Sequence, residues 1–214
     1  MLSYSKYNFF SLTATISFLL IILFIRIYSN YAFNIPLHFD EAQYWGWAQK
    51  IEWGYFSKPP VLAWLIALNT FMCGDTEPCI RISTPILYFL SSIFIFLTTK
   101  LLSQNNFLSG FAAIVFNLIP GITFSSFINT TDVPLIFFSS AFSYLFFLIY
   151  KKKQAPYFYY FLLGLVLTLG FLSKYAMFYL FVSLLALSLI YKNIKFKFLN
   201  LKNLLFFLSF LTNF

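Results

Sequence analysis

The chain has 214 residues, of which 61% are hydrophobic, 24% aromatic and only 9% charged, and its mean hydropathy is +0.82. A soluble globular domain carries about 25% charged residues and a disordered chain has low hydrophobicity, so this composition excludes both classes. The formal net charge of +8 lies in short breaks between apolar runs, where basic residues indicate membrane topology rather than nucleic-acid binding. The sequence therefore predicts an all-α polytopic membrane protein with no nucleic-acid partner.

The first apolar run, Phe9 to Ile25, ends at Arg26 without a small-residue cleavage pattern, which indicates a retained signal-anchor helix. A membrane-spanning helix needs about 20 apolar residues. The further runs of this kind are Ile82 to Thr99, Phe107 to Ile128, Val133 to Tyr150, Tyr157 to Leu172 and Tyr175 to Tyr191, with a seventh beginning near Leu204.

Charged residues divide between the two sides that these spans define. If the N-terminus is cytoplasmic and each run crosses once, nine lysines lie inside and four or five basic residues lie outside, in agreement with the positive-inside rule. Every carboxylate falls outside: Asp40, Glu41, Glu52, Asp75, Glu77 and Asp132. Acidic residues contribute little to topology, so their segregation indicates a working site on the outer face.

One outer segment, residues 29–80, is much longer than the other connections and contains all four tryptophans. Aromatic residues at this density are typical of elements at the lipid headgroup level. Residues Asp40 to Ile51 have helical spacing with Asp40, Tyr44 and Trp47 on one stripe. The run Val61 to Cys73 follows Pro59-Pro60 and is too short to span, so we expect a second interfacial helix there.

Three polar positions in these loops have both a structural and a functional interpretation. Asp40 could cap its helix or carry chemistry. Lys58, fixed in place by the two prolines, could reach ordinary lipid headgroups or bind a particular phosphate. Asp132, just before the fourth span, could cap that helix or supply a second outward carboxylate.

Lys174 lies between two apolar runs on the side where lysine is disfavoured, and it therefore requires an anionic partner: a lipid phosphate or a carboxylate such as Asp132. His38 is the only histidine; a metal role with Asp40 or Glu41 needs further ligands, so we predict no metal site from the sequence and leave a divalent ion open. Cys73 and Cys79 could pair if their compartment is oxidising.

The order of these motifs resembles the N-terminal half of a GT-C class glycosyltransferase. The motifs are Asp40-Glu41-Ala42-Gln43-Tyr44-Trp45, Gly54-Tyr55-Phe56-Ser57-Lys58-Pro59-Pro60, Gly74-Asp75 with Arg81, Asp132-Val133-Pro134-Leu135, and Leu172-Ser173-Lys174-Tyr175. The resemblance covers about residues 10 to 192. It points to the superfamily of protein O-mannosyltransferases, lipid A aminoarabinose transferases and lipopolysaccharide galacturonic acid transferases.

This resemblance implies a role for each matching residue. Asp40 takes the place of the catalytic carboxylate and Asp132 that of the second acidic position. Lys58 would hold the phosphate of a polyprenyl carrier. The remaining substrate-binding residues would be Glu41, Tyr44, Lys174 and Tyr175.

The implied reaction moves a sugar, with inversion, from a polyprenyl-phosphate donor to a hydroxyl of a lipid, polysaccharide or protein on the outer face of the inner membrane. We expect residues 1–214 to form one transmembrane domain, the N-terminal part of a longer architecture. Two other classes remain open: a transporter or flippase whose charged residues line a path, and an inactive membrane subunit.

Overall fold

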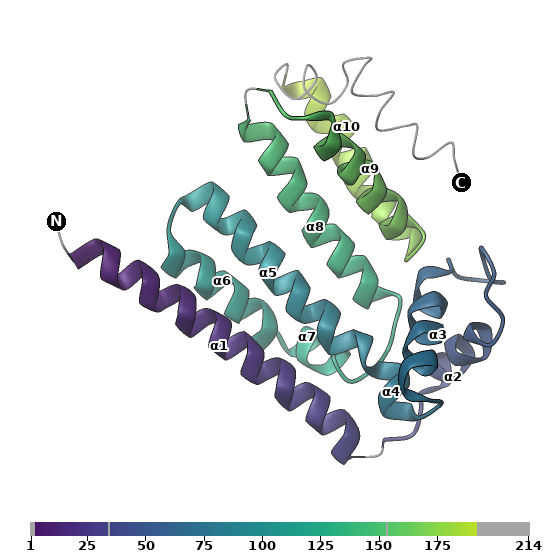
Figure 1. Cartoon of the computed structure of the whole chain (residues 1–214). Coiled ribbons are helices and arrows are strands. Elements are labelled where there is room, and N and C mark those ends of the chain that lie inside the picture. The colour runs from purple at the N-terminus through teal and green to yellow at the C-terminus, as the bar shows by residue number, and fades with distance from the viewer. Residues whose placement is uncertain (1–2, 34, 153, 192–214) are drawn as a thin grey trace.

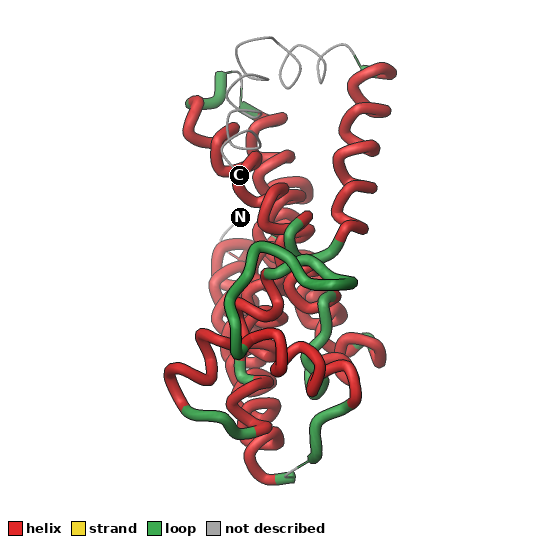
Figure 2. The backbone as a smooth tube through the Cα atoms, turned by 90° about the vertical axis from the view of Figure 1, so that its right-hand side faces the viewer, coloured by secondary structure: helices red, strands yellow, loops and turns green. Residues whose placement is uncertain are grey.

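The computed structural model describes residues 3–33, 35–152 and 154–191, and in these ranges the chain forms helices and loops without any strand (Figures 1 and 2). This confirms the predicted all-α class. The predicted run beginning near Leu204 lies outside the described residues. The helices are α1 (Ser3–Ala32), α2 (Phe39–Ala48), α3 (Val61–Cys73), α4 (Glu77–Arg81), α5 (Ser83–Ser103), α6 (Asn106–Leu118), α7 (Pro120–Ser125), α8 (Asp132–Lys151), α9 (Tyr157–Phe171), the short 3-10 helix η1 (Tyr175–Met177) and α10 (Phe178–Ile190).

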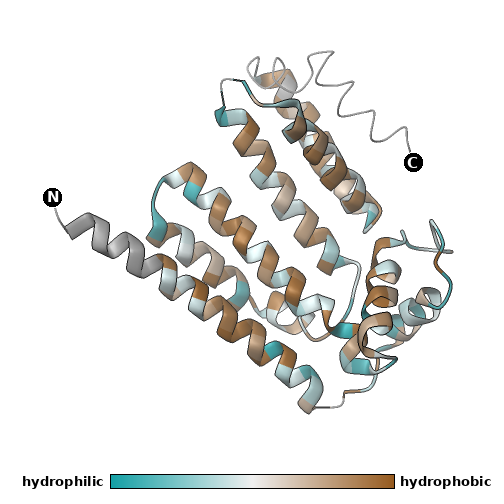
Figure 3. Ribbon diagram, viewed as in Figure 1, coloured by the Kyte–Doolittle hydropathy of each residue, from teal (hydrophilic) through white to brown (hydrophobic). Residues whose placement is uncertain are grey.

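The bundle is built around α5, which packs against both α6 and α8; α1 lies against α6, and α9 lies against α8. Figure 3 shows that the bundle helices are hydrophobic along most of their length, as helices in lipid must be. Among the described residues, three helical stretches are long and apolar enough to cross a membrane: Leu12–Ala32, Glu77–Ser103 and Asp132–Lys151. The chain is therefore a helical membrane protein, as predicted.

The expectation of one continuous span from Phe107 to Ile128 is wrong. Helix α6 ends at Leu118, Ile119 adopts an extended ψ of 125°, and α7 begins at Pro120. Proline has no N–H to continue the helix and disfavours helical geometry in the residue before it, so the chain turns at this point. Helix α9, with 15 residues, is only about 22 Å long, which is shorter than the hydrocarbon core of about 30 Å.

Helices α2, α3 and α4 gather at one end of the bundle, beyond the first turn of α8 (Figure 1). Helix α3 has the predicted bounds, whereas α2 ends at Ala48 and leaves Ile51 outside it. The two helices share a small apolar core, whose buried members are Tyr44, Ala48, Leu62, Ala63, Ile66 and Ile80.

The caps of α2 and α8 differ from the expectation. His38, not Asp40, occupies the N-cap of α2; its Nδ1 accepts from the Asp40 N–H at 3.5 Å, and its own N–H donates to Glu41 Oε2 at 2.9 Å. Thr131 occupies the N-cap of α8, so Asp132 is the first helical residue. Neither aspartate side chain is therefore used as a cap.

Candidate functional site

The predicted site residues lie on α2, on the segment that leads into α3, at the start of α8 and in the connection after α9. Direct contacts tie these segments to one another at the same end of the bundle. Asp40 and Lys58 therefore belong to one end of the molecule.

The carboxylate of Glu41 links several of these segments through four hydrogen bonds. Arg81 donates to it twice, from Nε to Oε1 at 2.8 Å and from Nη2 to Oε2 at 2.6 Å. The backbone N–H of Asn129 donates to Oε1 at 2.8 Å, and His38 N–H completes the set on Oε2. Glu41 has no exposed side-chain area, so in this structure it cannot touch a substrate and instead fixes the start of α2 beside the loop before α8.

Arg81 extends the same network to the connection between α1 and α2. Its Nη1 and Nη2 donate to the backbone carbonyls of Ile35 and Pro36 at 2.8 and 3.0 Å. The Asn129 side chain joins the network as well, since its Nδ2 donates to the Ile80 carbonyl at 2.9 Å. The chain entering α2, the end of α4 and the approach to α8 are therefore held together, mostly by charged hydrogen bonds, which are stronger than neutral ones.

Asp132 and Lys174 form the second ion pair at this end of the bundle, with Nζ and Oδ1 separated by 2.6 Å. This confirms the expectation that Lys174 requires an anionic partner. The Lys174 side chain is 35% exposed and the Asp132 side chain is 50% exposed, so both remain accessible to solvent or a ligand. Tyr175, next in the chain, is exposed and its ring lies 5.4 Å from that of Phe171.

The Lys58-Pro59-Pro60 segment is joined to the same place through the backbone. The N–H of Val61, the first residue of α3, donates to the carbonyl of Leu172 at 3.1 Å. This bond lies three residues after Lys58 and two residues before Lys174, so it brings the two lysine-bearing segments side by side. The half-buried Lys58 ammonium has no hydrogen-bond or ion-pair partner within the described ranges.

Tyr44 connects the two predicted catalytic carboxylates electrostatically. Burial raises the pKa of the Tyr44 hydroxyl, and the carboxylates of Asp40 and Asp132 raise it further. Tyr44 therefore stays a neutral hydrogen-bond donor at physiological pH. Asp40 itself is exposed, and its carboxylate has no partner among the residues that the structure describes.

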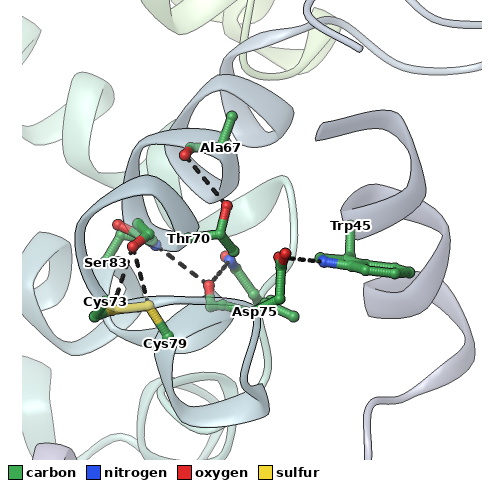
Figure 4. Close-up of a disulfide and its surroundings, with 10 residues drawn as sticks. Trp45, Ala67, Thr70, Cys73, Asp75, Cys79 and Ser83 are labelled. Atoms are coloured by element: carbon green, nitrogen blue, oxygen red, sulfur yellow. Dashed lines mark hydrogen bonds between the residues drawn. A yellow bond between two sulfur atoms is a disulfide. The ribbon is translucent and has the colours of Figure 1, made fainter. Parts of the chain in front are cut away.

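A disulfide joins Cys73 to Cys79 and closes the turn between α3 and α4 (Figure 4). Within this turn, the Asp75 carboxylate accepts from Trp45 Nε1 at 2.9 Å. The turn is thereby attached to α2, and the pairing that the sequence left open is present in the structure.

An apolar hollow of about 230 Å³ lies next to the Lys174 connection and is lined by Leu167, Phe171, Met177, Phe178 and Phe181. No group of three or more His, Cys, Asp or Glu side chains in the described part of the chain could hold a metal ion. The arrangement consequently offers charged groups beside an apolar surface, which suits a ligand with an anionic head and a lipid tail.

Sequence reasoning missed the roles of Arg81 and Asn129. Asn129 acts through its backbone N–H, which carries no signal in the sequence. Arg81 had a signal: a lone arginine directly before an apolar span is costly without a partner.

Comparison with known proteins identifies the family. Residues 57–214 match the family described as dolichyl-phosphate-mannose-protein mannosyltransferase, which is well over half of the chain. The chain belongs to this mannosyltransferase family. The match confirms the resemblance to GT-C glycosyltransferases and includes Lys58, Asp132 and Lys174, whereas Asp40 and Tyr44 precede it.

A curated relative, the lipid A galacturonosyltransferase RgtD of Rhizobium johnstonii, is 32% identical over 142 residues. This alignment covers 64% of the chain but 28% of RgtD, so it compares the chain with less than a third of that protein. No solved structure matches the chain. The chain is thus a helical membrane protein that belongs to a family of glycosyltransferases.

Proposed function

We propose that the protein transfers a sugar from a polyprenyl-phosphate carrier to a hydroxyl group of a lipid, polysaccharide or protein, at the membrane surface where α2 and α3 lie. Its relative RgtD is a lipid A galacturonosyltransferase, which favours a lipid acceptor among these classes.

Asp40 is the general base of the proposed reaction. Its free carboxylate takes the proton of the acceptor hydroxyl while the hydroxyl oxygen attacks the anomeric carbon. The bond between that carbon and the carrier phosphate breaks, and the phosphate leaves with the bonding electrons. Attack opposite the leaving phosphate inverts the anomeric configuration.

Lys58 and Lys174 stabilise the leaving phosphate. Lys58 has no competing partner among the described residues, so its ammonium is available for an anion that gains charge in the transition state. Lys174 can exchange Asp132 for the phosphate, which frees the Asp132 carboxylate to contact the sugar or the acceptor. The neutral Tyr44 hydroxyl supplies a hydrogen-bond donor for the substrate beside the two carboxylates, and exposed Tyr175 flanks the headgroup. We leave Glu41 out of the substrate-contacting residues because it is fully enclosed.

The observation that carries this proposal is the Asp132–Lys174 pair: a short ion pair, half exposed, on segments bonded to those of Asp40 and Lys58. A transport pathway would instead place such charges near the middle of the membrane. The apolar hollow beside Lys174 gives the first part of the carrier's tail a surface to follow.

The proposed site faces the outside of the inner membrane, with the N-terminus in the cytoplasm. The lysine distribution supports this orientation, and so does the disulfide in the site-bearing loop, because disulfides persist in oxidising compartments such as the periplasm.

The test is a transfer assay in membranes that contain the full chain, with radiolabelled polyprenyl-phosphate sugars as donors. Asp40→Asn should lower the rate by about 10²- to 10⁴-fold, the usual contribution of a general base, with protein level unchanged. Glu52→Gln is the matched control, since Glu52 is an exposed carboxylate of the same loop paired with Lys50. Full activity of Asp40→Asn would remove Asp40 from its role, and a wild-type chain that uses no such donor would refute the proposed function.

A further inference from the structure

Helix α1 contains a buried cation that the proposed reaction does not use. Arg26 is 5% exposed, and no carboxylate forms an ion pair with it within the described residues. Its Nη1 donates to Asn117 Oδ1 at 2.9 Å and its Nη2 donates to the Asn117 backbone carbonyl at 3.0 Å. A charged group in an apolar helix is unfavourable unless its donors are satisfied, so Arg26 must serve a purpose at this position.

That reason is the break between α6 and α7. Because Pro120 interrupts the helix, the last carbonyls of α6 lose their intrahelical donors, and in an apolar surrounding no water replaces them. Arg26 supplies one donor to the Asn117 carbonyl, and the Thr123 hydroxyl supplies another at 3.0 Å. A cation at a helix C-terminus is also favoured by the helix dipole. Arg26 therefore acts as the C-terminal cap of α6.

The segment that follows this cap leads to the site. From α7 the chain is held by Ser125, whose Oγ accepts from the Tyr88 hydroxyl at 2.7 Å. It is held next by Asn129, whose N–H donates to Glu41 and whose Oδ1 accepts from Thr84 at 3.2 Å. Asp132 follows three residues after Asn129. The position of Asp132 consequently depends on anchors at both ends of residues 119–131.

We propose that Arg26 is a positioning residue of the transferase: by capping α6 it fixes the path of residues 119–131 and so the place of Asp132 opposite Lys174. This inference rests on the proposed function. Arg26 acts through Asn117 and the broken helix, not by contact with the sugar or the carrier.

The variant Arg26→Met tests the proposal, since methionine keeps the length of the side chain, removes the donors and does not hinder membrane insertion. Amide hydrogen exchange of the full chain in lipid nanodiscs should accelerate in residues 119–131 and remain unchanged in α9. In the transfer assay, kcat should fall by about 10- to 100-fold, as expected for misplaced reacting groups, while the KM for the donor stays within twofold of wild type. Arg26→Lys keeps the charge but loses the bidentate geometry, so its kcat should lie between those of the wild type and Arg26→Met.

Leu19→Ala is the control, because Leu19 is equally buried in α1 but does not contact the cap. If Leu19→Ala lowers kcat as much as Arg26→Met at an equal loss of thermal stability, general destabilisation explains the effect and the proposal is overturned. Unchanged exchange in residues 119–131 of Arg26→Met overturns it as well. The exchange measurement needs no substrate. A wild-type chain without transferase activity would therefore refute the proposed function, while hydrogen exchange would still show whether Arg26 fixes residues 119–131.

Discussion

Two ion pairs stand at the same end of this bundle with the same N–O distance of 2.6 Å, yet their surroundings differ completely. Glu41 and Arg81 are 0% and 2% exposed, whereas Asp132 and Lys174 are 50% and 35% exposed. Both carboxylate oxygens of Glu41 accept two hydrogen bonds each. Distance alone therefore does not distinguish a framework contact from one that can exchange its partners.

The difference follows from desolvation. A buried pair whose partners are all satisfied is expensive to break, because the remaining charge is left without water or counter-ion. An exposed pair contributes about 0–1 kcal/mol, since water and dissolved ions can replace either partner. The buried pair is thus suited to holding the site together, and the exposed pair is suited to taking part in a reaction.

The largest effect should come from breaking the buried pair. Arg81→Met leaves the Glu41 carboxylate enclosed without its counter-ion, and we expect the free energy of unfolding to fall by about 3–5 kcal/mol. Thermal unfolding in detergent, followed by tryptophan fluorescence, measures this directly. A loss below about 1 kcal/mol would mean that the buried pair contributes no more to stability than the exposed pair, and the distinction between them would be wrong.

The double variant Glu41→Leu with Arg81→Leu controls for the lone charge. It removes both ions, so part of the stability should return. The return should be incomplete because the N–H groups of His38 and Asn129 lose their acceptor, at a cost of about 1–3 kcal/mol for each buried donor left unpaired.

The next effect in size concerns the disulfide beside Arg81. Replacing Cys73 and Cys79 together by serine should lower stability by about 2 kcal/mol, the value expected for a short closed loop. The same unfolding measurement tests it, and reduction of the wild-type protein should give a loss of similar size. A serine variant with wild-type stability would mean that the apolar contacts of α2 and α3 alone hold the turn.

Much of this fold could be predicted from the apolar periodicity and the prolines. The bounds of α3 follow from Pro59-Pro60, and the class of the protein follows from composition. The break at Pro120 was missed because residues 107–128 are apolar throughout, and apolarity does not report whether a helix is continuous. The proline itself was the available signal.

The site could be predicted in part, because its charged residues are costly in a membrane protein and hence informative. Lys174 needed an anion, and Asp132 is that anion. Helical spacing already separates Glu41 from Asp40, because adjacent helical positions face different directions. The enclosure of Glu41 by Arg81 could not be foreseen, since these two residues lie far apart in the sequence.

Breaking the exposed pair should change stability little and activity strongly. Lys174→Met should alter the free energy of unfolding by less than about 1 kcal/mol and lower the rate of transfer, because the leaving phosphate loses a cation. Lys50→Met is the matched control: Lys50 forms an exposed pair with Glu52 at 2.7 Å in the loop between α2 and α3. This pair has no role in the proposed reaction, so the variant should leave both quantities unchanged. Lys174→Met with normal transfer would show that this pair has no part in the reaction.

The smallest effect should appear in the pH dependence of stability. Because burial, Asp40 and Asp132 raise the pKa of Tyr44, the folded protein retains this proton at a pH where the unfolded chain, with an ordinary pKa of about 10, has begun to lose it. Stability should therefore decline as pH rises past about 10, and Tyr44→Phe, which has no proton to lose, should decline less. Unfolding measured from pH 8 to 11 compares the two proteins. In an Asp132→Asn background the gap between tyrosine and phenylalanine should narrow, since one source of the raised pKa is gone; a gap of unchanged size would mean that Asp132 does not act on Tyr44, and that the exposed pair is electrostatically separate from α2.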